Sequence, residues 1–312
     1  MADNWRVLDF THFEGELRFD KRTRKMQAID RATGEVSSHA LPDVNIVFVG
    51  IGVRLSSGLA YHLARNDVVA VFCDWKGMPI SSLYPWIDAH GRVAARQRAQ
   101  ASLSIPRSKN AWMRIVKAKI AGQANVLEER GSAKAKLLKD LSRQVRSGDI
   151  DNKEGQAARI YWKSLFEGTD FTRKPGAKEG GANGLLDYGY TILRGHSMRA
   201  VLSAGLTPAL GLYHKGRSNA FALADDLIEP FRPVVDRVVA LLPESERRIT
   251  KETRLSILSA CNDEFGAMEK TTPTIMKEFA QHYGQYVEGD IPLLNAPVFK
   301  PRDGGVHESE TR

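Results

Sequence analysis

The sequence predicts an α+β fold in which a small β-rich domain, residues 1–90, precedes a larger all-helical domain, residues 91–290. In the first domain, short apolar runs separated by turn residues are typical of strands. In the second, apolar residues recur at three- and four-residue steps, as in an amphipathic helix. Hydrophobic residues make up 42% of the 312-residue chain, which excludes a globally disordered protein. A polar tail, residues 291–312, is expected to be partly disordered.

The expected strands are of two kinds. Short runs bounded by glycine, aspartate or basic turn residues predict strands at residues 7–10, 16–19 and 25–29. The longer runs 45–49 and 67–73 are almost continuously apolar, which predicts a sheet buried on both faces. Between these two runs, residues 56–65 have helical spacing, with Ser56 as the expected N-cap.

Helical spacing dominates the second domain. Residues 110–129 place Trp112, Ile115 and Ile120 on one face, with basic residues opposite. Further helices are expected over residues 132–147, 151–167, 182–203, 218–242, 247–262 and 273–288. The chain contains no phosphate-binding loop, dinucleotide-binding glycine fingerprint or nucleophile elbow, which disfavours those enzyme classes.

Positive charge is concentrated in one segment. The whole chain has a net charge of +8, whereas residues 91–150 alone hold 14 basic and 4 acidic residues. Such a concentration is typical of a polyanion-binding face, although a solvated helix surface gives the same pattern. If the segment binds DNA, the residues expected to contact the backbone are Arg92, Arg96, Arg98, Arg107, Lys109, Arg114, Lys117 and Lys119.

Cysteines and targeting features indicate the compartment. Cys73 and Cys261 are too few for a disulfide framework or a zinc cluster, which favours a reducing compartment. The first residues lack a signal-peptide pattern, and the longest apolar run, Val44 to Val53, is about half the length that crosses a bilayer. We therefore expect a soluble cytoplasmic protein with no membrane association.

Three places in the helical domain collect residues that can bind metal. Glu154 lies in the first turn of an expected helix, His214 ends a segment bent by glycine and proline, and Asp226 and Glu229 are three residues apart on one helix face. Each has an ordinary structural alternative: a helix-dipole partner, a histidine bonded to backbone, and a solvated acidic face. Together they form an oxygen-rich set that suits Mg²⁺ or Mn²⁺, and next to a basic segment this favours phosphoryl transfer on nucleic acid.

Four segments in register carry a family resemblance: residues 154–162, 183–190, 205–214 and 223–233. Their residue types, order and spacing resemble the CRISPR-associated integrase of spacer acquisition, the larger of the two universal adaptation subunits. The resemblance covers about residues 5 to 290. The last segment is most similar to the branch that accompanies single-effector, type II systems.

The resemblance implies a homodimer, joined by a small companion subunit into a heterohexamer. It also implies a metal held by Glu154, His214 and an acidic residue, for which both Asp226 and Glu229 remain open. The implied reaction inserts a short DNA duplex into a CRISPR repeat by attack of a 3′ hydroxyl on a phosphodiester. Further DNA contacts are expected from Arg159, Tyr161, Asn183, Tyr188 and Arg194, with core packing as the alternative for Tyr161. Two other functions remain open: a nuclease that uses water, and a DNA-binding scaffold without catalysis.

Overall fold

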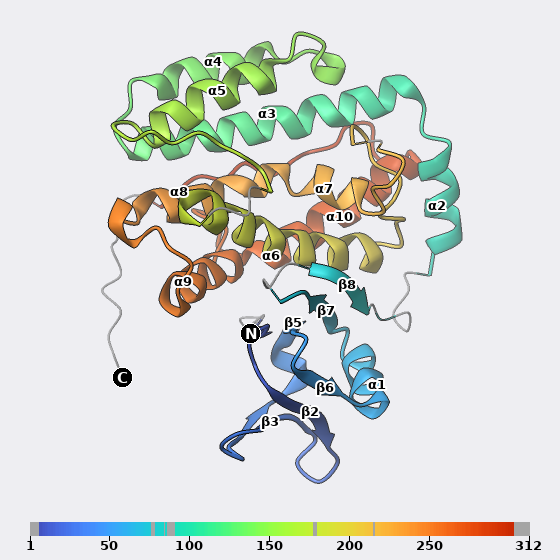
Figure 1. Cartoon of the computed structure of the whole chain (residues 1–312). Coiled ribbons are helices and arrows are strands. Elements are labelled where there is room, and N and C mark those ends of the chain that lie inside the picture. The colour runs from blue at the N-terminus through green and yellow to red at the C-terminus, as the bar shows by residue number, and fades with distance from the viewer. Residues whose placement is uncertain are drawn as a thin grey trace.

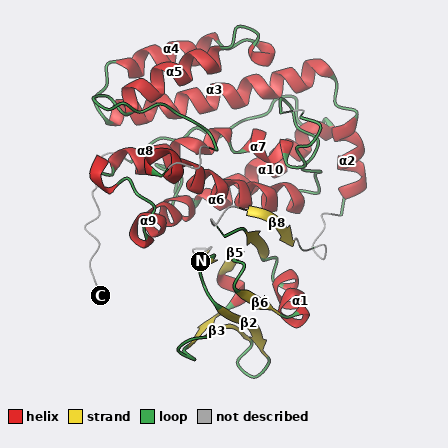
Figure 2. Ribbon diagram, in the orientation of Figure 1, coloured by secondary structure: helices red, strands yellow, loops and turns green. Residues whose placement is uncertain are grey.

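A computed structural model describes residues 6–75, 79–83, 85, 91–176, 180–214 and 216–302. It confirms the predicted α+β class, with the strands in the N-terminal part and the helices after them (Figure 1, Figure 2). The last part of the expected disordered tail, residues 303–312, lies outside the described residues. No helix within the described ranges is both long and apolar enough to cross a membrane.

The strands form two four-stranded sheets. The first has the order β1-β5-β7-β8, formed by Arg6–Phe10, Val44–Val49, Val69–Cys73 and Pro79–Leu83, with only β8 antiparallel to its neighbour. The second has the order β4-β3-β2-β6, formed by Val36–His39, Lys25–Asp30, Gly15–Asp20 and Val53–Leu55. Helix α1, Ser57–Arg65, begins at Ser56, whose side chain accepts a hydrogen bond from the Leu59 amide as expected of an N-cap.

The central strands of the first sheet, β5 and β7, are buried on both faces, as their apolar sequences predict. Every residue of β5 is buried; Ile46 and Phe48 belong to the large core of the helical part, whereas Val47 and Val49 belong to a second core beneath. Because successive strand side chains point to opposite faces, one strand contributes to both cores. The sheet therefore shares its upper core with the helical part of the chain.

The helices lie above this sheet in Figure 1, with α6 next to it and α3 further away. Their bounds are α2 Val93–Ala101, α3 Ile105–Glu129, α4 Lys134–Gln144, α5 Lys153–Leu165, α6 Gly181–Ser203, α7 Ala222–Leu227, α8 Arg232–Leu241, α9 Lys251–Asn262 and α10 Thr272–Glu288. Helix α3 packs against α4, α5 and α8, so it connects segments that are far apart in the sequence.

The prediction of a single helix over residues 218–242 is wrong. The segment is divided into α7, a 3₁₀ turn over Glu229–Phe231, and α8. Pro230 lacks an N–H and its ring crowds the preceding turn, which accounts for the break. The turn packs against α3 and places Glu229 at the junction of the two helices.

Candidate metal centre and DNA-binding surface

The start of helix α5 fixes the position of Glu154. The Asn152 side chain accepts a hydrogen bond from the Gly155 amide at 3.0 Å, and Asp149 accepts one from the Glu154 amide at 3.0 Å. A Cβ atom at Gly155 would lie 2.6 Å from the Asn152 side-chain oxygen, so a larger residue would force this capping side chain to shift. The first turn is thus held rigidly, and the Glu154 carboxylate is directed toward α3.

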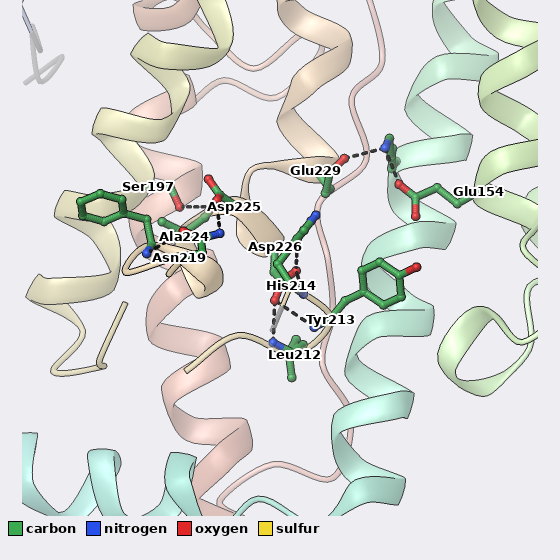
Figure 3. A network of polar contacts seen from close by, with 12 residues as sticks. Glu154, Ser197, Leu212, Tyr213, His214, Asn219, Ala224, Asp225, Asp226 and Glu229 are labelled. Atoms are coloured by element: carbon green, nitrogen blue, oxygen red, sulfur yellow. Dashed lines mark hydrogen bonds and ion pairs between the residues drawn. The ribbon is translucent and has the colours of Figure 1, made fainter. Parts of the chain in front are cut away.

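Glu229 reaches the same place from the other side. Its side chain is almost fully buried, and its Oε1 forms an ion pair with Arg232 at 2.9 Å. Its Oε2 lies 2.6 Å from the Lys119 ammonium, and Lys119 is also 2.5 Å from Oε1 of Glu154 (Figure 3). One ammonium group therefore connects the two carboxylates.

The electrostatics of this cluster favour its charged form. Burial opposes ionisation of Glu229, but the charges of Arg232 and Lys119 outweigh burial and lower the pKa of this carboxyl below its ordinary value. Burial likewise opposes the charge on Lys119, yet Glu229 and Glu154 raise the pKa of its ammonium. Lys119, expected to contact DNA backbone, instead lies inside the carboxylate cluster; the structure corrects that expectation.

Asp226 and His214 form a second unit beside the first. The Asp226 carboxylate is fully buried; one oxygen accepts from the amides of Leu212 and Tyr213 at 2.5 and 3.1 Å, and the other is 2.7 Å from His214 Nδ1 (Figure 3). This hydrogen bond, opposed by burial, raises the pKa of His214. Asp226 thereby fixes the loop and the imidazole orientation, which leaves Nε2 as the ring atom available to a ligand.

These residues can be tested for their fit to a divalent cation. Among the described residues, no group of three or more histidine, cysteine, aspartate or glutamate side chains is placed to hold a metal ion, and Lys119 lies between two of the candidate carboxylates. However, the donors are of the right kind: two carboxylates, and a histidine close enough to Glu229 for each to shift the other's pKa. Within the described chain, Oε2 of Glu229 is buried without a hydrogen bond of good geometry. The donor types therefore suit a hard cation, while Lys119 occupies the space between the two carboxylates.

A further buried carboxyl group lies nearby in α8. Asp236 is fully buried and accepts a hydrogen bond from the Tyr190 hydroxyl, with the Tyr161 hydroxyl also close. Burial raises the pKa of Asp236 to about 7, although the tyrosines and Arg232 oppose the shift. Its surroundings favour the neutral acid far more than those of Glu229 do.

Two cavities meet at His214. One, of about 590 Å³, is lined by Lys109, Trp112, Tyr213 and His214, among other residues. The other, of about 290 Å³, is lined by Arg194, Asp225 and Arg232 as well as His214. The imidazole can thus be reached from the basic N-terminal half of α3 and from the α6 side.

Several expected DNA contacts are engaged within the protein. Arg96 is buried and donates to Glu288 at 2.9 Å and to the Ala204 carbonyl at 2.7 Å. Tyr161 is fully buried, as in the core-packing alternative. Both expectations are corrected, because neither side chain is accessible to a duplex.

Two other expected contacts join parts of the fold. Asn183 donates to the Thr172 carbonyl at 2.9 Å and accepts from Arg173, which ties down the loop before α6. Tyr188 donates to Asp9 of β1 at 3.2 Å, which links the sheet to α6. These bonds give both residues a structural role.

The remaining basic candidates differ in accessibility. Arg98, Lys109 and Arg159 are exposed, whereas Arg114 and Lys117 are partly exposed on α3. The others make contacts within the chain: Arg92 with Glu288, Arg107 with the Tyr286 carbonyl, and Arg194 with Asp225. Arg92 and Arg194 are also exposed, with 56% and 41% of their side chains accessible, but each forms an ion pair within the chain. The candidates retained for DNA contact are Arg98, Lys109, Arg114, Lys117 and Arg159.

Arg232 is a site residue that sequence reasoning missed. Its guanidinium is 2.9 Å from Glu229 and lies over the Tyr190 ring at 4.5 Å. Its position three residues after Glu229 could have predicted this ion pair, since side chains at this spacing meet on a helical turn.

Comparison with solved structures identifies the fold. A casposase bound to its integration product has a TM-score of 0.76 and 20% identity, and the match covers 95% of this chain and 94% of that one. A chain of a Cas6-RT-Cas1–Cas2 complex has a TM-score of 0.72 and 18% identity over 95% of this chain and 36% of that one. The chain thus has the fold of Cas1 proteins and casposases.

Sequence comparison gives the family. The profile described as CRISPR associated protein Cas1 matches residues 10–255. A protein from Neisseria meningitidis named CRISPR-associated endonuclease Cas1 is 36% identical over 237 residues, which covers 75% of this chain and 74% of that protein. The chain belongs to the Cas1 family, and the family resemblance of its four motifs is confirmed.

Proposed function

We propose that this chain is a metal-dependent DNA integrase and endonuclease that inserts short foreign duplexes into a CRISPR array. In the proposed reaction, a 3′ hydroxyl of the incoming DNA attacks a phosphodiester of the repeat, and the leaving group is the 3′ oxygen of the cut strand. The phosphoryl group passes directly from one oxygen to the other, so no covalent bond to the protein forms.

Glu154, Glu229 and His214 are the residues we propose to hold Mg²⁺ or Mn²⁺. Such an ion, when bound, would polarise the phosphodiester and neutralise charge on the leaving oxygen. Glu229 is preferred to Asp226 as the acidic ligand, because both oxygens of Asp226 already accept hydrogen bonds. Asp226 is instead a positioning residue that holds the His214 ring and its loop.

The convergence of Glu154 and Glu229 on one cation carries this proposal. The two residues come from separate helical segments, and both carboxylates lie within 2.6 Å of the Lys119 ammonium. A merely solvated acidic face would not be buried with an internal counter-charge. The two cavities at His214 border this one proposed ligand, and neither is lined by Glu154 or Glu229.

The proposed DNA contacts are Arg98, Lys109, Arg114, Lys117 and Arg159, which are accessible and positively charged. They would bind phosphates without selecting sequence. The similarity to a chain of a Cas1–Cas2 complex supports a small companion subunit as partner. We propose that a homodimer and this companion form a heterohexamer in the cytoplasm.

The test is Glu154→Gln, which keeps the side-chain shape and removes the charge. We expect loss of strand transfer in an assay with Mn²⁺, a short duplex and a plasmid that carries a repeat, while the melting temperature and DNA affinity stay near wild-type values. Lys163→Met, at an exposed position on the same helix, is the control for general charge effects.

The same assay separates the alternatives. Unchanged strand transfer by Glu154→Gln would end the catalytic proposal and favour the DNA-binding scaffold. Release of cut strands without joined product by the wild-type protein would favour the nuclease that uses water.

A further inference from the structure

Lys119 lies between the two carboxylates proposed to bind the metal. Its ammonium nitrogen is 2.5 Å from Glu154 and 2.6 Å from Glu229, and its side chain is only 13% exposed. Two carboxylates that contact the same ammonium group are close to each other, and their mutual repulsion disfavours the ionisation of both unless a cation lies between them. Lys119 supplies that cation from within the protein.

The other basic group in the cluster cannot replace it. Arg232 contacts Oε1 of Glu229, on the side away from Lys119 Nζ, which contacts Oε2. No ion pair joins Arg232 to Glu154 in the described part of the chain. Lys119 is therefore the bridge between the two carboxylates, and its position overlaps the place where a shared metal ion would bind.

We propose that Lys119 is a built-in counter-cation: it holds Glu154 and Glu229 together before metal binding, and a divalent ion must displace it. The inference rests on the proposed function, since it requires these carboxylates to be metal ligands. A lysine suits this role because its compact charge is carried on a flexible four-carbon stem, which can withdraw without movement of helix α3. Lys119 thereby stabilises the metal-free protein and lowers its affinity for the metal.

The experiment is a calorimetric titration of metal-free protein with Mn²⁺, with Lys119→Met compared with wild type. Without a competing ammonium, we expect Mn²⁺ to bind about tenfold to a hundredfold more tightly. The metal-free variant should melt at a lower temperature, because the buried Glu229 and the partly buried Glu154 are left without their bridge. Saturating Mn²⁺ should raise its melting temperature more than that of wild type.

Two further variants make the result specific. Lys119→Gln also removes the charge but keeps an amide that can donate a hydrogen bond, so it gives the same affinity comparison if the methionine variant does not fold. Lys163→Met removes an exposed charge from α5 and should leave Mn²⁺ affinity at the wild-type value.

Equal or weaker Mn²⁺ binding by the Lys119 variants would overturn the inference. Glu154→Gln, titrated in parallel, separates this failure from failure of the proposed function. If Glu154→Gln weakens binding and the Lys119 variants do not tighten it, only the displacement of Lys119 is refuted. If Mn²⁺ binding does not depend on Glu154, the metal centre itself is refuted.

Discussion

Two buried carboxyl groups lie seven residues apart in the sequence and differ in chemistry. Glu229 faces Lys119 and Arg232, and these charges lower its pKa despite burial. Asp236 faces the Tyr190 hydroxyl in a fully buried position, and burial raises its pKa to about 7. From the sequence alone, Glu229 and Asp236 were both acidic residues of the single helix expected over residues 218–242, with nothing to distinguish them.

The difference shows that neighbours decide which carboxylate can bind a cation. Glu229 retains its charge and has one oxygen directed at a group that can move. Asp236 lies at a position where tyrosines supply hydroxyl donors and where ionisation is opposed. We therefore propose Glu229, and not Asp236, as a metal ligand; Asp236 contributes to the packing of α6 against α8.

The largest expected effect separates these two groups directly. Glu229→Gln should reduce strand transfer by about 10³-fold or more, equivalent to about 4 kcal/mol in barrier height, because a proposed metal ligand is lost. Asp236→Asn, the matched control, should keep transfer within about threefold of wild type. Comparable losses of strand transfer in the two variants, measured at equal folded fractions, would contradict the different roles given to Glu229 and Asp236.

The pH dependence of stability tests the Asp236 side of the comparison. Since its pKa is raised from 3.8 to about 7 in the folded protein, the folded state favours the proton. The associated stability is present at low pH and is lost as pH rises through about 7, by up to about 1.4 kcal/mol per pH unit.

Urea unfolding at pH 5, 6 and 7 measures this loss. The unfolding free energy of wild type should fall relative to that of Asp236→Asn as pH rises, because the asparagine does not titrate. A difference that is constant across this range would mean that Asp236 titrates normally.

A smaller effect is expected at Asp226, which positions His214 and the loop before it. Asp226→Asn should weaken Mn²⁺ binding by about tenfold to a hundredfold, as is usual when the partner of a ligating histidine is altered. The amide retains one acceptor for the Leu212 or Tyr213 amide, so the fold should persist. An affinity loss as large as that of Glu229→Gln would make Asp226 a direct ligand instead.

The smallest effect concerns the basic surface. Combined replacement of Lys109, Arg114 and Lys117 by glutamine should lower the slope of log affinity against log salt by roughly 0.9 for each DNA phosphate that these side chains neutralise. Filter binding of a short duplex between about 50 and 200 mM salt gives this slope. A slope equal to that of wild type would assign these residues to a solvated helix face.

The sequence predicted the fold class and most elements because their hydrophobic periods are strong. The buried sheet followed from the continuous apolar strands, and helix α3 from its regular apolar face. Helix α2 was missed because its alanine, arginine and glutamine residues give no apolar stripe. The break at Pro230 was missed because the apolar pattern continues through the turn.

The candidate ligands could be named from the sequence because the family motifs mark them, but their neighbours could not. Lys119 is one of many basic residues in its segment, and only the packing of α3 against α5 and the Glu229 turn distinguishes it. The different roles of Asp226 and Glu229 also depend on tertiary contacts. Asp226 accepts hydrogen bonds from backbone amides of the 212–214 loop, whereas Glu229 faces Lys119 on α3.

The proposed centre requires Glu154, Glu229 and His214 to share one divalent ion, and an anomalous difference map from a crystal soaked in Mn²⁺ tests this most directly. We predict one peak within bonding distance of both carboxylates and of His214 Nε2, with the Lys119 ammonium withdrawn. A saturated crystal in which Lys119 still bridges the carboxylates and Mn²⁺ binds elsewhere would contradict the proposal.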